Sequence, residues 1–361
     1  MEGLGEKLVI MLTEIEKQRY LRHILLEEIG EAGQLKLKQA KVLVIGAYGL
    51  GCPVLQYLTA AGVGKIGIVD DDLVDRSNLQ RQILFSEKNV GEPKVIAAKN
   101  RLQEMNGSIE IVAYKERLSA GNALALFSAY DIIVDGSDNF STKYLANDAA
   151  VLSGKPLVFG SIFKFDGQVS VFNYQNGPTY RCLFPKPGLA EEMPSCSEVG
   201  VLGILPGIIG NLQANEVLKM ILGIGNILSG KLLLFDALDI QIQILPFSKN
   251  PDLVVTNLKE INFSCENNLI NSLSFKEYLK SPKSFTLLDI RNSNERAVYH
   301  IGGLHIPLSD LEKRYSELVF EDNLLVYCAS GIRSSKAISK LEILFPEKKI
   351  YNLEGGLKNI K

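Results

Sequence analysis

The chain has 361 residues, of which 46% are hydrophobic and 22% charged, and its formal net charge is −2. This length predicts two domains, and the composition excludes wholesale disorder. Because positive charge is not in excess, we expect neither nucleic acid nor a membrane surface as a partner. With only three histidines in the chain, histidine-based acid–base chemistry and histidine-rich metal sites are not expected.

The five cysteines are an odd number, and none of them forms a C-x-x-C pair. This pattern indicates a reducing compartment and not a disulfide framework. The apolar run at residues 8–12 is too short, and its surroundings too acidic, for a signal peptide. The apolar stretches 42–69 and 199–212 are interrupted by Gly, Pro, Asn and Gln, which favours buried elements over membrane spans. We therefore expect a soluble cytoplasmic protein.

The first part of the chain alternates helices with short apolar strands. After a helix over residues 14–26, strands are predicted at 41–45, 65–70, 109–114 and 131–135, with helices at 53–61, 95–105 and 122–127. A strand, a glycine turn, a helix and a strand within about 30 residues form a βαβ unit. The alternation predicts a Rossmann-like, doubly wound α/β sheet.

From residue 157 the pattern changes to strands in quick succession. Strands are predicted at 157–160 and 167–174, then a polar loop at 176–198, an apolar helix at 202–222, and two strands within 231–245. A loop of that length is usually functional. The Asn-rich segment 248–271 predicts a linker, which divides the chain into domains at 1–247 and 272–361.

The second domain shows a smaller α/β pattern. A helix begins at Ser274, and strands are predicted at 286–290, 324–327 and 349–352, with further helices at 308–315 and from Ser334. About 95 residues are enough for a small independent domain.

The turn after the first strand reads Gly46-Ala47-Tyr48-Gly49-Leu50-Gly51. Glycines in such a turn let a phosphate approach the backbone N–H groups of a helix N-terminus. A dinucleotide fingerprint would need glycine in place of Tyr48, so the turn does not match an NAD site. Taken alone, it also fits a tight turn without a ligand. Asp70, at the end of the second strand, is placed to hydrogen-bond ribose hydroxyls.

Three further motifs follow in order: Ser77-Asn78-Leu79-Gln80-Arg81-Gln82, Gly91-Glu92-Pro93-Lys94 and Asp135-Gly136-Ser137-Asp138-Asn139. With these motifs and Cys196, the chain resembles the E1-like activating enzymes of the MoeB/ThiF family from about Arg19 to Leu245. Members of that family adenylylate the C-terminal glycine of a ubiquitin-like sulfur carrier. The resemblance implies the same fold, the use of ATP and Mg²⁺, and the same reaction here.

The resemblance also implies roles for single residues. Gly49 packs against the ATP phosphates, Asp70 holds the ribose, and Asp138 holds Mg²⁺ with Asn139 beside it. Arg22 matches an arginine that enters the partner subunit's site, which implies a homodimer. The nucleotide is lined by Ser77, Asn78, Leu79, Gln80 and Arg81, and Asn78, Arg81 and Lys94 lie near the phosphates. Cations are needed there because a carboxylate attacking a phosphate brings two anions together.

Several of these residues also have simpler interpretations. Taken alone, Arg22 would be a solvated arginine on a helix. Asp71 and Asp72 would be solvated residues at a strand end, and Asp135 would form a turn after a strand. Only the complete set supports the site. Tyr48 departs from the family, which has glycine there, and we expect its side chain to point away from the phosphates.

Relatives in this family often carry a structural zinc between two C-x-x-C pairs. Here only Cys182 remains, and one ligand of four cannot build the site, so we predict no zinc. Cys196, in the long polar loop, matches a family cysteine that forms an acyl thioester or resolves a sulfur-transfer intermediate. Its alternative is an inert surface thiol. We expect no catalytic role for Cys52 or Cys182. Cys265 lies in the predicted linker.

The second domain resembles a rhodanese module. The resemblance rests on Asp289-Ile290-Arg291, residues 300–308, the loop 328–334 and Gly355-Gly356-Leu357. A cysteine directly after a buried strand, in a loop that opens a helix, meets N–H groups that favour a thiolate or persulfide. Cys328 has this position, and Arg333 adds positive charge. His300 and His305 are read as structural.

Together these features predict an ATP-dependent adenylyltransferase with sulfurtransferase activity. The partner would be a sulfur carrier of the MoaD/ThiS type ending in Gly-Gly, and a persulfide donor such as a cysteine desulfurase would load Cys328. Arg22, Arg81, Lys94, Cys196 and Cys328 are the predicted catalytic residues. Whether the pathway is of molybdopterin or thiamine type stays open. The alternatives are a non-catalytic scaffold that binds nucleotide or carrier, suggested by Tyr48, and an NAD-dependent oxidoreductase.

Overall fold

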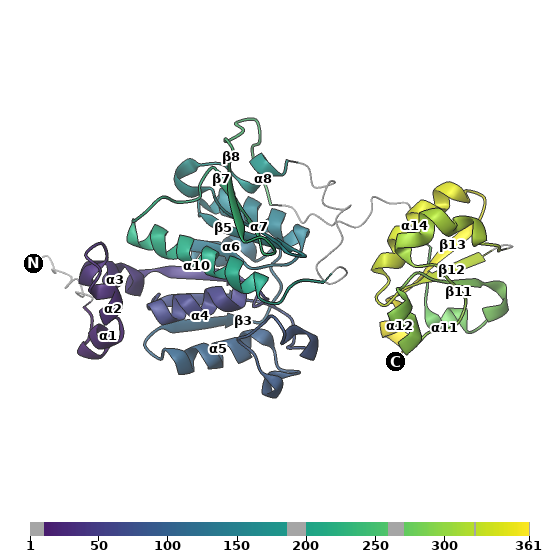
Figure 1. The fold of residues 1–361 in the computed structure, drawn as a ribbon, viewed down its shortest axis with the longest axis horizontal. Coiled ribbons are helices and arrows are strands. Elements are labelled where there is room, and N and C mark those ends of the chain that lie inside the picture. The colour runs from purple at the N-terminus through teal and green to yellow at the C-terminus, as the bar shows by residue number, and fades with distance from the viewer. Residues whose placement is uncertain (1–10, 186–199, 259–270, 321–322, 361) are drawn as a thin grey trace, which may run out of the picture. The chain divides into compact units, whose positions relative to one another are not determined.

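The computed structural model describes residues 11–185, 200–258, 271–320 and 323–360. By its internal contacts the chain divides into two compact units, Met1–Phe263 and Ser264–Lys361. Each unit is built around its own β-sheet (Figure 1). We describe the two units separately. Among the described residues, no helix is both long enough and apolar enough to cross a bilayer.

The first unit contains an eight-stranded sheet in the order β3-β2-β1-β4-β5-β6-β7-β8. Five parallel strands form one part: β1 (Lys41–Ile45), β2 (Lys65–Val69), β3 (Glu110–Tyr114), β4 (Ile132–Asp135) and β5 (Leu157–Phe163). Three antiparallel strands extend it: β6 (Asp166–Phe172), β7 (Lys231–Asp236) and β8 (Gln241–Pro246). Because β2 and β4 flank β1 on opposite sides, the strand order reverses at β1. A crevice for ligands forms at the carboxyl ends of strands at such a point.

Helices cover both faces of this sheet. Val42 and Val44 of β1 enter one core, while Leu43 and Ile45 enter the other. The first core packs against α4 (Gly51–Ala61), α5 (Lys94–Met105) and α10 (Leu205–Leu222), and the second against α6 (Ala123–Ser128) and α7 (Phe140–Ser153). A strand buried on both faces explains the continuous apolar run of β1. The predicted doubly wound α/β class is therefore confirmed.

The structure differs from the sequence prediction at the N-terminus. The helix predicted over 14–26 is two short helices, α1 (Glu14–Arg19) and α2 (Leu21–Ile24). The break is at Tyr20, which is buried against Gly62 and accepts a hydrogen bond from Asn106 Nδ2 at 2.8 Å. In the first unit the sequence also did not predict α3 (Gly30–Gln39), α7 or the short α8 (Tyr180–Leu183), which lies inside the expected loop.

The second unit is a five-stranded parallel sheet in the order β11-β10-β12-β13-β9. Its strands are β9 (Asn271–Leu273), β10 (Thr286–Asp289), β11 (Leu304–His305), β12 (Asn323–Tyr327) and β13 (Lys349–Leu353). Its helices are α11 (Phe275–Tyr278), α12 (Ser293–Val298), α13 (Leu311–Arg314) and α14 (Ile332–Leu344). Helix α12 forms where the sequence predicted a polar turn. The helix predicted at 308–315 is α13 with a 3₁₀ helix on either side, Leu308–Asp310 and Tyr315–Glu317. The central strand β12 ends directly before Cys328.

Candidate active site

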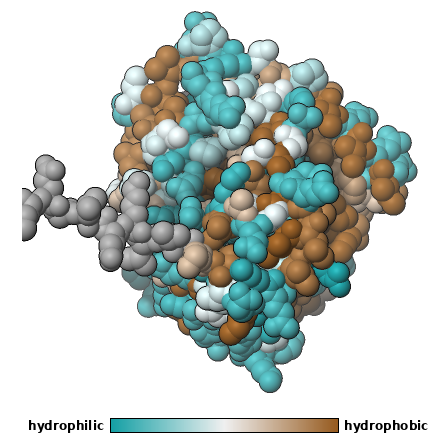
Figure 2. Space-filling view, turned by 90° about the vertical axis from the view of Figure 1, so that its left-hand side faces the viewer, coloured by the Kyte–Doolittle hydropathy of each residue, from teal (hydrophilic) through white to brown (hydrophobic). Residues whose placement is uncertain are grey.

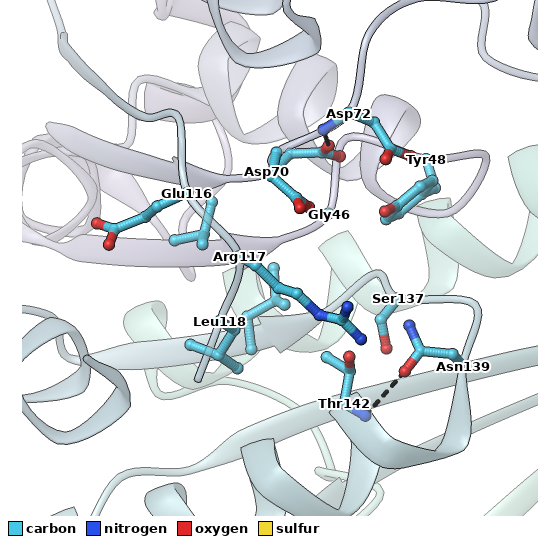
Figure 3. A pocket seen from close by; sticks show the side chains of 13 residues that line it. Gly46, Tyr48, Asp70, Asp72, Glu116, Arg117, Leu118, Ser137, Asn139 and Thr142 are labelled. Atoms are coloured by element: carbon cyan, nitrogen blue, oxygen red, sulfur yellow. Dashed lines mark hydrogen bonds between the residues drawn. The ribbon is translucent and has the colours of Figure 1, made fainter. Parts of the chain in front are cut away.

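A cavity of about 230 Å³ opens at the carboxyl ends of the parallel strands in the first unit (Figure 3). It therefore lies at the strand-order reversal, where ligands of open α/β sheets bind. The lining residues come from the strand ends and the loops that follow them: Ile45, Gly46, Tyr48, Val69, Asp70, Asp71, Asp72, Glu116, Arg117, Leu118, Ser137, Asn139 and Thr142.

Asp70 follows β2 directly and lies in this wall. Its Oδ2 accepts a hydrogen bond from the Ala47 N–H and its Oδ1 one from the Asp72 N–H, both at 2.8 Å. Burial raises the pKa of Asp70 to about 6, although Lys94 and the two backbone donors favour the ionised form. Each carboxylate oxygen keeps a lone pair that a ribose hydroxyl can use.

The glycine turn brings β1 and α4 together closely. Gly46 has a φ of 85°, in the left-handed region that favours glycine. A Cβ on Gly51 would lie 2.0 Å from the Gly46 carbonyl oxygen, so only glycine fits there. Gly49 is outside the cavity wall, where a Cβ would lie 3.0 Å from Pro206 Cβ and 3.6 Å from Arg81 Cγ. Arg81 and Gly49 are therefore neighbours.

Tyr48 does not point away from the cavity, and that expectation was wrong. Its side chain lines the cavity beside Asp70 and Asp72 (Figure 3). The centroid of its ring lies 4.1 Å from Lys94 Nζ. Burial raises the pKa of the Tyr48 phenol, and the nearby carboxylates of Asp70, Asp138 and Asp72 raise it further. The attraction between the ring face and the ammonium of Lys94 explains why the side chain turns inward.

Lys94 is the first residue of α5 and is 2% exposed. Its ammonium forms an ion pair with Asp72 at 2.9 Å, and its backbone N–H donates to the Asp72 carbonyl at 3.0 Å. Lys94 does not belong to the cavity wall, whereas Tyr48 and Asp72, which both contact its ammonium, do.

The residues from Ser77 to Arg81 form a short 3₁₀ turn and the loop after it. The side chain of Asn78 accepts a hydrogen bond from the Asp75 N–H at 3.2 Å, and Arg81 Nη1 donates to the Ser77 carbonyl at 3.0 Å. Leu79 packs against the core, and Gln80 lies against Gly203 at the start of α10. None of these five residues lines the cavity, so the structure places them beside it and not in its wall.

Asn139 lines the cavity and also begins α7. Its Oδ1 accepts hydrogen bonds from the Thr142 N–H at 2.9 Å and from Ser141 Oγ at 2.8 Å. The preceding Asp138 is exposed, and its charge acts on Tyr48. Asp135 is instead fully buried and paired with Lys143 at 3.0 Å, which agrees with its interpretation as a structural residue.

Sequence reasoning missed several residues of the cavity wall, above all Arg117, which follows β3. Figure 3 shows its guanidinium directed toward Ser137 and Asn139. The signal that could have identified Arg117 is its position directly after a predicted parallel strand, at the sheet edge where Asp70 was already placed.

Of the predicted catalytic residues that the structure describes, which are Arg22, Arg81, Lys94 and Cys328, none belongs to the wall of this cavity. Arg22 lies on α2 and is exposed. Cys196 falls outside the described residues. Their roles stay predictions.

Cys328 begins the loop between β12 and α14 in the second unit and is fully buried. Its Sγ accepts hydrogen bonds from the Gly331 N–H at 3.1 Å and from Ser334 Oγ at 3.4 Å. Arg333 forms two hydrogen bonds to the Glu295 carboxylate, at 2.7 and 2.6 Å, so its charge is largely offset. The hydrogen bonds to this sulfur thus come from one backbone N–H and one hydroxyl, which are both neutral donors.

The two histidines of the second unit make local hydrogen bonds. His300 Nδ1 accepts from the Gly302 N–H at 3.1 Å, and His305 Nε2 lies 2.7 Å from the Arg291 carbonyl oxygen. These contacts agree with structural roles.

The position expected for a zinc site holds Cys182 as its sole thiol. The Cys182 sulfur accepts hydrogen bonds from the Thr179 N–H at 3.4 Å and the Asn250 N–H at 3.3 Å. Burial alone would raise the pKa of this thiol, but these donors and Lys249 lower it overall. Within the described ranges, the acidic or thiol side chains close enough to share a cation are Asp70, Asp71 and Asp72.

Comparison with known proteins gives two domain matches. Residues 20–255 match the ThiF family, and residues 273–361 match the rhodanese-like domain. A sulfur carrier protein adenylyltransferase of Thermus thermophilus is 53% identical over 66% of this chain and 90% of its own length. The probable adenylyltransferase/sulfurtransferase MoeZ of Mycobacterium tuberculosis is 40% identical over 92% of this chain and 89% of its own.

The fold also has solved neighbours. The Escherichia coli protein MccB, crystallised with ATP, has a TM-score of 0.58 over 68% of this chain and 76% of its own, at 23% identity. At that identity the likeness concerns the fold alone.

Proposed function

Because the chain belongs to the ThiF family and ends in a rhodanese-like domain, we propose that it activates a sulfur carrier with ATP and then thiolates it. The chain is an adenylyltransferase with sulfurtransferase activity, since a relative named for both activities aligns with 92% of it. Residues 1–247 would adenylylate the C-terminal glycine of a ubiquitin-like carrier, and residues 272–361 would supply sulfur. The observation that carries the proposal is the combination, in one chain, of a strand-end cavity with Asp70 in its wall and a cysteine held by N–H and O–H donors.

In the first reaction, the carrier's terminal carboxylate attacks the α-phosphorus of ATP and pyrophosphate leaves. Asp70 binds the ribose hydroxyls, and Arg81 beside Gly49 offsets the charge that develops on the phosphates. Lys94 contributes a second positive charge once it reaches them. Residues 77–80 and Asn139 complete the nucleotide site.

Magnesium bound with ATP would supply further positive charge to the phosphates. Asp138 is the ligand that we assign, because its carboxylate is exposed and close enough to Tyr48 to raise the pKa of that phenol. Carboxylate oxygens are ligands that Mg²⁺ prefers. We propose no structural zinc, since Cys182 is the one thiol at that position.

In the second reaction, a persulfide on Cys328 attacks the acyl carbon of the adenylate and AMP leaves. The Gly331 N–H and Ser334 Oγ stabilise the anionic sulfur before attack. The proposed source of the sulfur is a persulfide donor such as a cysteine desulfurase. The product of this attack is an acyl disulfide between the carrier and Cys328. Cys196 is the thiol that we assign to the next step: its thiolate attacks the Cys328 sulfur, the thiocarboxylate leaves, and an external thiol reduces the resulting Cys196–Cys328 disulfide.

We also propose that the enzyme is a homodimer. Several large apolar side chains are exposed on α1, α2 and the residues next to them: Met11, Ile15, Leu21, Leu25 and Leu26. Figure 2 shows apolar areas on this side of the molecule. Such exposure is typical of protein interfaces. Arg22 lies among these residues, which supports its role in a partner's site. The unpaired cysteines support a cytoplasmic location, and nothing in the charge supports nucleic acid or membrane as a partner.

ATP–pyrophosphate exchange, measured with and without carrier protein, tests the first reaction. Lys94→Ala and Arg81→Ala should each lower the exchange rate by about 10²–10³, because each removes a charge from the phosphate site. Lys88→Ala, at an exposed lysine, is the control and should leave the rate unchanged. Near-normal exchange in the first two variants would remove these residues from the site.

The second reaction is tested with Cys328→Ala. This variant should lose sulfur transfer from thiosulfate while exchange continues at the normal rate. Full thiocarboxylate formation without Cys328 would mean that sulfur does not pass through the rhodanese-like domain.

One observation favours a second candidate function, a scaffold that binds nucleotide or carrier without turnover. Tyr48 lies in the cavity where the family has glycine, and it covers Lys94. The exchange assay separates the two functions, since a scaffold would bind ATP and show no carrier-dependent exchange.

A further inference from the structure

Tyr48 separates Lys94 from the cavity that would hold the nucleotide. The Tyr48 ring lines the cavity together with Asp70 and Asp72 (Figure 3). Lys94 is 2% exposed and is not among the lining residues. Two groups hold the lysine there. Its Nζ lies 2.9 Å from an Asp72 carboxylate oxygen and 4.1 Å from the centroid of the Tyr48 ring.

We propose that Tyr48 positions Lys94: its ring holds the ammonium against Asp72 and out of the cavity, and the lysine reaches phosphate only after the ring turns away. The proposal rests on the function proposed above, in which Lys94 contacts the phosphates. Tyr48 therefore acts on the nucleotide through Lys94, by setting how often the ammonium is available.

The backbone of the glycine turn leaves space for the Tyr48 ring. A Cβ on Gly46 would lie 2.4 Å from Tyr48 Cδ2, so the ring lies directly over the backbone of Gly46. The φ of Tyr48 is not positive, so a side chain at this position meets no backbone strain. Gly46 thus provides the space that the Tyr48 ring occupies.

Burial and the nearby carboxylates keep the Tyr48 phenol protonated. Burial and the carboxylates of Asp70, Asp138 and Asp72 all raise the pKa of the Tyr48 phenol, so the ring stays neutral at physiological pH. A neutral ring presents a negative face to the ammonium, and the attraction is stronger where water is excluded. The ion pair and the ring contact therefore act together on Lys94 Nζ.

The consequence for nucleotide binding can be given as a fold-change. When the competent conformation is a fraction of the total, the apparent dissociation constant is the intrinsic constant divided by that fraction. An ammonium–aromatic contact of this kind shifts such an equilibrium by roughly two- to thirtyfold. Removal of the ring should therefore lower the dissociation constant for ATP by about two- to thirtyfold.

The first test measures whether Lys94 is covered, and it needs no nucleotide. The full chain is treated briefly with acetic anhydride, and acetylation of Lys94 is followed by peptide mass spectrometry relative to the exposed Lys88. Lys94 should react slowly in the wild type and in Tyr48→Phe, which keeps the ring. It should react at least about fivefold faster in Tyr48→Gly and Tyr48→Leu, which lose it. Equal rates in all four proteins would overturn the proposal.

The second test measures binding of a non-hydrolysable ATP analogue by calorimetry. The dissociation constant should fall in Tyr48→Gly and Tyr48→Leu and stay within about twofold of wild type in Tyr48→Phe. Tyr48→Leu retains bulk without an aromatic face, so it separates the ring contact from simple obstruction. Equal affinities in all proteins would overturn the proposal. No binding to any of them would overturn the proposed function instead, while the acetylation rates still decide the position of Lys94.

Discussion

Replacing Lys143 by methionine should destabilise the first unit strongly, because it removes the ammonium from a buried polar network under the candidate site. Lys143 Nζ donates to Asp135 Oδ2 at 3.0 Å, to the Ser137 carbonyl at 3.0 Å and to the Gly160 carbonyl at 2.9 Å. All three of its protons are thereby used. The side chain of Asp135 is fully buried and that of Lys143 is 5% exposed, so water cannot replace the lost bonds.

The magnitude follows from what Lys143→Met leaves behind. Asp135 would still accept hydrogen bonds from the Ser137 N–H at 2.9 Å and from Ser137 Oγ at 2.5 Å. Its carboxylate would nevertheless become an uncompensated buried charge. Breaking a buried pair in this way costs about 3–5 kcal/mol. Hydrogen exchange of the full chain, read by mass spectrometry, reports each unit separately. Amides of β1 and β4 that exchange through unfolding of this unit should exchange about 10²- to 10⁴-fold faster.

Two controls make the result decisive. Asp135→Leu combined with Lys143→Met removes both charges and should recover part of the lost stability, as apolar replacement of buried pairs does. Arg76→Met breaks a solvent-exposed ion pair, Arg76–Glu87 at 3.1 Å, and should cost less than about 1 kcal/mol. If Lys143→Met is no more destabilising than Arg76→Met, the network does not hold the site in place.

Three other predictions concern single residues. ATP affinity should fall as the pH drops through about 6, because protonation of Asp70 removes the charged acceptor for the ribose. Titration calorimetry between about pH 5 and 8 measures this dependence, which should be absent in Asp70→Asn. Gly356→Ala should abolish sulfur transfer from thiosulfate without changing pyrophosphate exchange, because its Cβ would lie 2.5 Å from the Cys328 carbonyl oxygen at a φ of +61°. Cys182→Ala should cost about 1–2 kcal/mol in thermal unfolding and Cys182→Ser less, because alanine leaves the part-buried Thr179 N–H without its acceptor.

The sheet could be predicted from sequence, whereas parts of its helical cover could not. The strands of the parallel sheet are short apolar runs. They can be recognised in the sequence because a strand covered on both faces has apolar residues on both sides. Helix α7 lacks a clean apolar stripe, since its buried residues include Lys143, Asn147 and Asp148. Those side chains are buried because partners elsewhere in the chain neutralise or hydrogen-bond them, and a pattern of apolar residues does not reveal such partners.

The candidate site shows the same limit. Asp70 could be placed from its position at a strand end, and Cys328 from its loop. The inward orientation of Tyr48 depends on Lys94, and the offset charge of Arg333 depends on Glu295, each far along the chain. Local sequence specifies the backbone that carries Tyr48 and Arg333, but their direction and effective charge are set by these distant partners.

The two units offer different groups to an anion, and the difference suits the two reactions proposed for them. Phosphoryl transfer develops charge over several oxygens, which calls for full positive charges such as Arg81 and Lys94. A persulfide must remain nucleophilic, and a thiolate loses nucleophilicity as its pKa falls. Dipoles from the Gly331 N–H and Ser334 Oγ can favour the anion without a direct ion pair to a cation, and the pairing of Arg333 with Glu295 keeps that arginine from acting as a free counter-ion. We propose that the Glu295–Arg333 pair in this way limits the positive charge that Arg333 offers to a persulfide on Cys328.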